Sequence, residues 1–195
     1  RSDSHYPEPT SHHQKLSIIH ASILDLSDID MARHVKGCSA VASCLGHNIS
    51  FKGIYGQPRR LVTEAARRLC KAIKANRPDK PVKFVLMNTA GNRNRDLSEP
   101  ISFGEKCVTG LIRLLLPPHK DNEMAADFLR VELGQDDSDI EWVAVRPDSL
   151  IHAEAPSEYE VYPSPIRSAI FNAGRTSRIN VGHFMSELIT SQDCW

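Results

Sequence analysis

Small and polar residues follow the apolar segments of this chain at four places, and their types are those that hold a flat polar ligand. An acidic side chain, a glycine, an amide beside a hydroxyl and a proline-bounded turn would together line a cleft, because ligands bind beyond the carboxyl ends of parallel strands. The four groups are Asp25-Leu26, Leu45-Gly46-His47, Asn88-Thr89-Ala90-Gly91 and Arg146-Pro147-Asp148-Ser149-Leu150.

Each group also has a purely structural interpretation, which the residues alone leave open. Asp25 suits the entry of a helix, Gly46 suits a turn, and Thr89 suits a hydroxyl that is satisfied at the end of a strand. The prediction of a ligand site therefore depends on the four groups lying together, and so on the elements that position them.

The segments before the four groups have the composition of buried strands, since they are short, apolar and rich in β-branched or small residues. Strands are expected at 16–24, 39–45, 81–91 and from Ile140 to Pro147. Helices are expected from a Ser27 N-cap to Gly37, from Pro58 to Asn76, at 104–116 and 121–133, and from Asn180 onwards. This alternation predicts an α/β fold with a mainly parallel sheet and helices on both faces.

Length and composition favour one ordinary globular domain over residues 1–195, with a flexible segment at 1–14. The chain is 41% hydrophobic and 25% charged, which excludes disordered and collagen-like classes. The longest apolar stretch is far shorter than the ~20 residues that span a bilayer, and no export signal is visible. We therefore expect a soluble, cytoplasmic protein with no membrane partner.

The charged and metal-binding residue types carry no clear signal of their own. The chain has 24 basic residues (Lys and Arg together) and 24 acidic residues (Asp and Glu together), so no nucleic-acid partner is expected. The arginine-rich helix at 58–77 is interpreted as a helix face exposed to solvent. The five cysteines are scattered, which favours buried, inert thiols over a catalytic one. No metal site is predicted, because His12-His13 lacks ligand spacing.

Taken together, the motifs resemble the atypical short-chain dehydrogenase/reductase superfamily, and within it the NAD(P)H-binding branch of NmrA-like and flavin-reductase-like proteins. The motifs are Asp25-Leu26 after an apolar run, GCSAVASCLG at 37–46, NTAG at 88–91, WVAVRP at 142–147 and SRINVGHF at 177–184. The resemblance covers nearly the whole chain. It implies a Rossmann-like fold and a nicotinamide dinucleotide cofactor, NADP(H) or NAD(H).

The resemblance also implies cofactor contacts, position by position. Arg1 would face the 2′-phosphate of NADP, which gives a slight lean to NADP(H). Asp25 and Leu26 would border the adenine. Leu45 and Gly46 would pass beneath the cofactor, since a glycine lets the backbone approach closely.

The nicotinamide end of the cofactor would be held by the later strand ends. Asn88 and Thr89 would face the nicotinamide, and its amide edge would be closed over by Pro147, Asp148, Ser149 and Leu150. A threonine can orient a substrate or donate a proton, so Thr89 is a candidate catalytic residue.

The chain departs from the family pattern in its catalytic residues. The Tyr-x-x-x-Lys pair of typical short-chain dehydrogenases is not found in the sequence. Lys120, near the place where related proteins carry a lysine, is the other candidate for proton transfer, and a simply exposed lysine is the alternative.

A second departure concerns the phosphates of the cofactor. The strand and Gly-x-x-Gly-x-x-Gly turn that open such domains, and whose amides hold the pyrophosphate, have no counterpart here. If Arg1 corresponds to the end of the second family strand, the expected domain is truncated at its N-terminus. Its exposed strand edges would then favour association, as in a homodimer.

Two functions of different classes follow. The first is an oxidoreductase that transfers hydride between a nicotinamide cofactor and a small carbonyl, quinone or flavin-like substrate, with the cofactor carrying the chemistry. The second is a non-catalytic, NmrA-like dinucleotide sensor or protein-interaction scaffold, which the missing Tyr-x-x-x-Lys pair favours. Cofactor binding without turnover would distinguish the second from the first.

Overall fold

The structure is a computed structural model that describes residues 16–48, 50–97, 99 and 101–195. The predicted flexible segment at 1–14, and with it Arg1, lies outside the described residues. Across those ranges, no helix is long and apolar enough to cross a bilayer.

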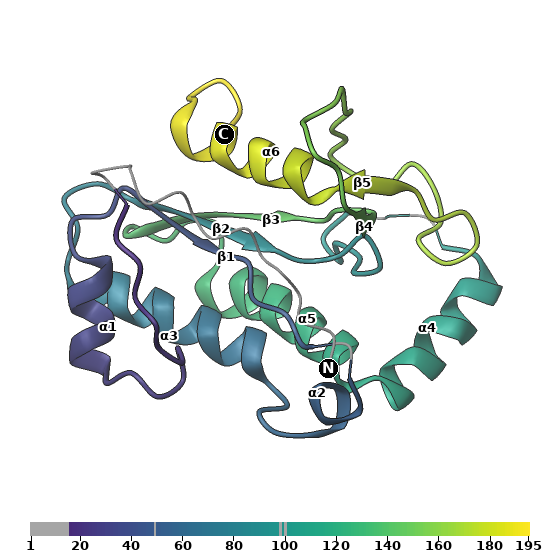
Figure 1. Ribbon diagram of the computed structural model, residues 1–195, viewed down its shortest axis with the longest axis horizontal. Helices are drawn as coiled ribbons and strands as arrows, with labels where there is room; N and C mark the ends of the chain where they lie inside the picture. The colour runs from purple at the N-terminus through teal and green to yellow at the C-terminus, as the bar shows by residue number, and fades with distance from the viewer. Residues whose placement is uncertain (1–15, 49, 98, 100) are drawn as a thin grey trace.

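Three parallel strands form the centre of the molecule (Figure 1). They are β1 (Ala40–Ser43), β2 (Val82–Met87) and β3 (Ile140–Val145), in the order β1-β2-β3. The side chains of Phe84, Val85 and Leu86 in β2 are fully buried, as expected for a middle strand that is covered on both faces. A second sheet pairs β4 (Ser149–Ile151) with β5 (Arg175–Ser177), also in parallel.

Helices cover both faces of the central sheet (Figure 1). On one face lie α1 (Asp28–Val35), α3 (Leu61–Ala75) and α5 (Pro117–Asp127), and on the other lies α6 (Arg178–Thr190). Phe84 and Leu86 pack with the first layer, while Val85 packs with α6, because successive side chains of a strand point to opposite faces. The predicted α/β fold with a parallel sheet between helices is confirmed.

The predicted boundaries of the first helix are confirmed, because Ser27 and Gly37 mark its two ends, whereas the next helices begin at other residues than predicted: α3 at Leu61 rather than Pro58, and α5 before residue 121. The Ser27 side chain accepts a hydrogen bond from the Asp30 backbone N–H at the start of α1. Gly37 follows that helix with a φ of 73°, which a residue with a Cβ rarely adopts. Pro117 is the first residue of α5, so this helix begins four residues before the predicted 121, since proline suits the first helical position.

Three further elements had no clear sequence signal. These are the short helix α2 (Phe51–Tyr55) and the pair β4 and β5. The predicted helix at 121–133 also changes type at Phe128, where α5 passes into the π-helix η1 (Phe128–Leu133). Gly134 ends it with a φ of 81°, and its carbonyl accepts a 2.6 Å hydrogen bond from Trp142 Nε1 of β3.

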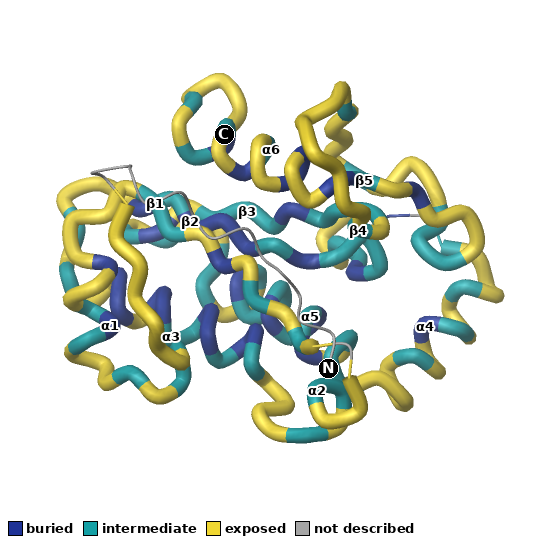
Figure 2. The backbone as a smooth tube through the Cα atoms, viewed as in Figure 1, coloured by how far each residue is buried: buried dark blue, intermediate teal, exposed yellow. Residues whose placement is uncertain are grey.

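The helix α4 (Phe103–Leu115) extends away from the sheet, and its surface is largely exposed (Figures 1 and 2). Thr109 is its only buried residue. Phe103 and Leu114 are 81% and 79% exposed. The helix was correctly predicted at 104–116, and although its sequence is strongly apolar, which favours burial, most of its apolar side chains are exposed.

The predicted strand at 16–24 is wrong. The segment is irregular and closes in a turn, where Asp25 N–H donates to the Ser22 carbonyl at 3.0 Å. Leu16 and Ile18 are 60% and 55% exposed. The composition suits a strand, but a strand needs a neighbour, and in the part of the chain that the structure describes β1 pairs with β2 alone.

The expected burial of the cysteines is confirmed only for Cys70. Cys38, Cys44, Cys107 and Cys194 are exposed. Burial raises the pKa of the Cys70 thiol to about 12, so that thiol stays protonated and inert.

Candidate functional site

Three of the four predicted groups lie at one edge of the central sheet. Ser43 pairs with Leu86 and Leu86 pairs with Ala144 across the three strands. Gly46, Thr89 and Pro147 each lie three residues beyond this line, so the chain leaves the sheet at the same level in all three strands. Parallel strands bring their carboxyl ends together in this way.

The pairing of β2 with β3 continues past the ends of the strands. Asn88 N–H donates to the Val145 carbonyl at 2.7 Å, and Ala90 N–H donates to the Pro147 carbonyl at 3.0 Å. The backbone on both sides of Thr89 is therefore fixed against the turn that begins at Pro147.

The fourth group, Asp25 and Leu26, is not brought to this edge. The Leu26 carbonyl accepts a hydrogen bond from Arg68, which lies in the middle of α3. The carboxyl edge of the sheet is adjacent instead to the N-terminal end of α3, where His47 and Asp121 meet. The placement of Asp25 depended on a strand that does not form, and the adenine contact assigned to this group stays a prediction.

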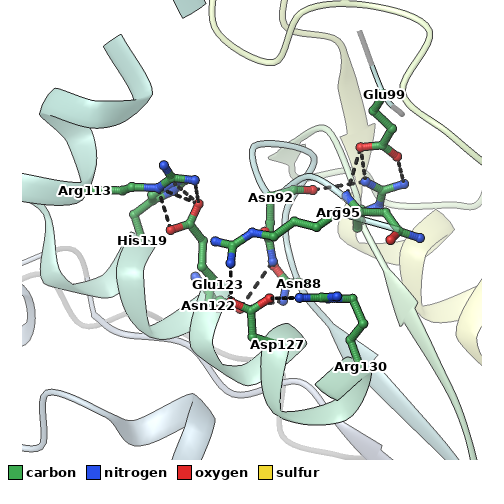
Figure 3. A network of polar contacts seen from close by, with 12 residues as sticks. Asn88, Asn92, Arg95, Glu99, Arg113, His119, Asn122, Glu123, Asp127 and Arg130 are labelled. Carbon is green, nitrogen blue, oxygen red and sulfur yellow. Dashed lines mark hydrogen bonds and ion pairs between the residues drawn. The ribbon is translucent and has the colours of Figure 1, made fainter. Parts of the chain in front are cut away.

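Asn88 shapes the end of β2 through contacts within the protein (Figure 3). Its side chain is buried, and its Nδ2 donates to the Asn122 carbonyl of α5 at 3.0 Å. Its Oδ1 accepts from Thr89 N–H at 2.9 Å and from Asn92 Nδ2 at 3.3 Å. These bonds tie the edge of the sheet to α5, whereas contact with a nicotinamide stays a prediction for this residue.

Thr89 and His119 approach each other beside Gly91. Gly91 N–H donates to Thr89 Oγ1 at 3.3 Å. A Cβ on Gly91 would lie 3.7 Å from Thr89 Oγ1 and 3.8 Å from His119 Cε1. His119 therefore reaches the end of β2 from α5, while its neighbour Lys120, the residue that the sequence suggested, is exposed.

The imidazole of His119 belongs to a charged cluster at the start of α5 (Figure 3). Its Nε2 lies 3.5 Å from Glu123 Oε1. Arg113 of α4 holds the same carboxylate with two donors, Nε to Oε2 at 2.8 Å and Nη2 to Oε1 at 2.7 Å. Burial alone would raise the pKa of Glu123, but His119 and Arg113 together lower it to about 2. The sequence signal for this cluster was the spacing of His119 and Glu123, four residues apart on one helix.

We expect Glu123→Gln to lower the free energy of unfolding by about 2 kcal/mol near neutral pH, since the Glu123 pKa is depressed on folding and the 46% exposed Arg113 is partly screened. The stabilisation is present at pH values above 4.5, the ordinary pKa of this carboxyl, and is lost as the pH falls from 4.5 towards 2. Urea unfolding at a series of pH values measures the difference. An equal difference between variant and wild type at neutral and acidic pH would contradict this assignment.

The turn after β3 is fixed by close packing. Asp148 lies against Gly174, where an added Cβ would overlap its carboxylate, so a larger residue at 174 would displace the Asp148 side chain. Ser149 is exposed at the start of β4, and Leu150 packs against the apolar cluster below α6. Pro147 to Leu150 thus form a rigid border of the edge.

Arg146 joins this border to the loop after β2. Its Nη2 donates to Glu99 Oε1 at 2.8 Å, and its Nη1 donates to the Asn92 carbonyl at 3.1 Å. Burial works against ionisation of Glu99, yet the hydrogen bond from Arg146 leaves the pKa of Glu99 below its ordinary value.

A cleft of about 50 Å³ lies beside Gly91, between the loop after β2, the start of α4 and residues 165–170. Enclosed sites for drug-sized ligands measure roughly 300–1,000 Å³, so this cleft holds only a small group. The edge is open at Gly46, where an added Cβ would meet no atom within 4 Å. A long ligand would therefore lie across the edge rather than in a closed cavity.

Comparison with known proteins adds one positive finding. A family model described as NAD(P)H-binding matches residues 1–192. No curated protein and no solved structure matches the chain. The matched range includes all three strand ends that the register brings together.

Proposed function

Because the chain belongs to the NAD(P)H-binding family, we propose that it is an oxidoreductase whose dinucleotide lies across the carboxyl edge of β1, β2 and β3. The register that aligns Gly46, Thr89 and Pro147 carries this proposal. The substrate is a small carbonyl, quinone or flavin-like molecule. When bound, the cofactor supplies a hydride, so the protein has to hold it, orient the substrate and exclude water.

The residues at the edge fit the nicotinamide and ribose part of such a cofactor. Gly46 leaves the space above the backbone open, which a flat ring or a ribose can enter. Thr89 is half-buried, and its hydroxyl lies near His119 beside Gly91, where it would orient a carboxamide or a substrate oxygen. The turn from Pro147 closes the far side.

Selection between the two cofactors is a finer part of the proposal. The lean to NADP(H) depends on Arg1, which lies outside the described residues. A side-by-side titration with NADPH and NADH is therefore part of the test.

Titration of the chain with NADPH and NADH, followed by calorimetry, is expected to give saturable binding with a Kd of ~100 μM or tighter, about −5.5 kcal/mol. Oxidation of NADPH is then measured with menadione, FMN and benzaldehyde as acceptors. Binding with turnover of at least one acceptor supports the oxidoreductase. Saturable binding without turnover of any acceptor rejects the catalytic part, and the absence of binding rejects the whole proposal.

A non-catalytic dinucleotide sensor or scaffold is the second candidate. It is supported by the exposed apolar side chains of α4, above all Phe103, Leu111 and Leu114, which a protein partner would cover. This candidate predicts cofactor binding that changes association with a partner and consumes no NADPH.

A further inference from the structure

His119 stands at the carboxyl end of β2, although it comes from α5. The position of a Cβ on Gly91 lies 3.8 Å from His119 Cε1 and 3.7 Å from Thr89 Oγ1. A methyl group on Gly91 would touch both side chains, so Thr89 and His119 border a shared space beside this glycine. Gly91 is half-buried and is one of the residues that line the small cleft.

The orientation of the imidazole is set by its neighbours. Its Nε2 is buried and lies 3.5 Å from Glu123 Oε1 without forming a hydrogen bond to it, while its Cε1 faces Gly91. Since Nε2 is next to Glu123, the ring nitrogen that remains for a substrate is Nδ1, which is bonded to Cε1. Arg113 binds the Glu123 carboxylate from the other side, and Glu123 in turn contacts the His119 ring, so both residues position the imidazole.

Charges reach the imidazole from two helices. Glu123 is on α5 itself, and Arg113 comes from α4. From the loop after β2, the neutral residues Thr89 and Gly91 lie near the ring. Asp121 of α5 points to α3, where it binds Val62 and Thr63.

Resting on the oxidoreductase proposed above, we propose that His119 donates the proton to the substrate oxygen and that Glu123 and Arg113 position its ring. Hydride from the cofactor adds to the carbonyl carbon, and the electron pair of the broken π bond moves to the oxygen. That oxygen takes the proton from Nδ1 of the imidazolium, which leaves a neutral imidazole. The imidazole regains a proton from water, and Thr89 orients the same oxygen by a hydrogen bond.

The kinetic test compares His119→Asn with wild type in the oxidation of NADPH. We expect kcat with a carbonyl acceptor to fall about 10²–10⁴-fold. The Kd for NADPH, measured separately by calorimetry, is expected to stay within about twofold. The matched control is His183→Asn, the same substitution on α6, where the histidine contacts Tyr159 Oη at 2.7 Å and is exposed. Its kcat is expected to equal that of wild type.

A second variant places a methyl group beside both Thr89 and His119 without changing either residue. Gly91→Ala adds its Cβ in ordinary van der Waals contact, at 3.7 and 3.8 Å, so the fold should be retained. It is expected to lower kcat at least about tenfold, because the substrate oxygen can no longer lie between Thr89 and His119.

A readout independent of turnover uses protein with isotope-labelled histidine, in which the His119 resonance is the one missing from His119→Asn. Its chemical shift is expected to move on saturation with NADPH. If wild type oxidises NADPH and His119→Asn has the same kcat, the proton-donor role fails while the oxidoreductase stands. A His119 resonance that stays in place at saturation also overturns it. Failure of wild type to bind or oxidise NADPH would overturn both proposals.

Discussion

An Asp121→Ala variant is expected to lose about 3–5 kcal/mol of the free energy of unfolding, since several buried donors share this one carboxylate. Its side chain is fully buried and accepts hydrogen bonds from Val62 N–H at 2.8 Å, Thr63 N–H at 3.1 Å and Thr63 Oγ1 at 2.6 Å. His47 Nε2 lies 2.8 Å from the same carboxylate. No side chain caps α3 locally, so Asp121 from α5 serves as its N-terminal cap.

Urea unfolding monitored by circular dichroism measures this loss. The matched control is Asp127→Ala on the same helix, whose ion pairs with Arg95 and Arg130 are partly exposed. That change should cost less than about 1 kcal/mol. Equal losses in the two variants would mean that Asp121 is no more than an ordinary charged residue of α5.

Gly46→Leu is expected to weaken NADPH binding about 100-fold, or by ~2.7 kcal/mol, if the dinucleotide lies across the carboxyl edge. The backbone at Gly46 faces open space, so the leucine side chain would occupy the volume assigned to the cofactor. Because an added Cβ at this position has no protein atom within 4 Å, the free energy of unfolding should change by less than about 0.5 kcal/mol.

Gly110→Leu is the control for this substitution. Gly110 also has no atom within 4 Å of an added Cβ, but it lies on α4. Its variant should bind NADPH as wild type does. Similar affinities for wild type, Gly46→Leu and Gly110→Leu would place the cofactor elsewhere on the protein.

Local signals in the sequence were sufficient for the central sheet and most helices. The run at 82–87 is continuous and apolar because both faces of β2 are covered, and Ser27 and Gly37 mark the ends of α1 through their own backbone geometry. The segment at 16–24 shows the limit of such signals. Its composition fits a strand, but pairing is decided by the presence of a neighbour, which composition does not reveal.

For the candidate site, the sequence predicted the strand ends but not the side chains that meet them. Gly46, Thr89 and Pro147 follow apolar runs, so alternation alone places them at one edge. His119 was missed in favour of Lys120, because which of two adjacent residues faces the sheet depends on the rotation of α5. That rotation follows from helix α5 beginning at Pro117 and from Asp121 binding α3, a contact between distant parts of the chain.

The consecutive residues Asp121, Asn122 and Glu123 face three different parts of the protein: α3, the end of β2 and α4. This turn of α5 is thus fixed in rotation, since turning the helix about its axis would break all three contacts at once. The wall of the edge that carries His119 is therefore rigid. We therefore expect any opening that admits a substrate to involve residues 165–170, which border Gly91 on the other side of the small cleft.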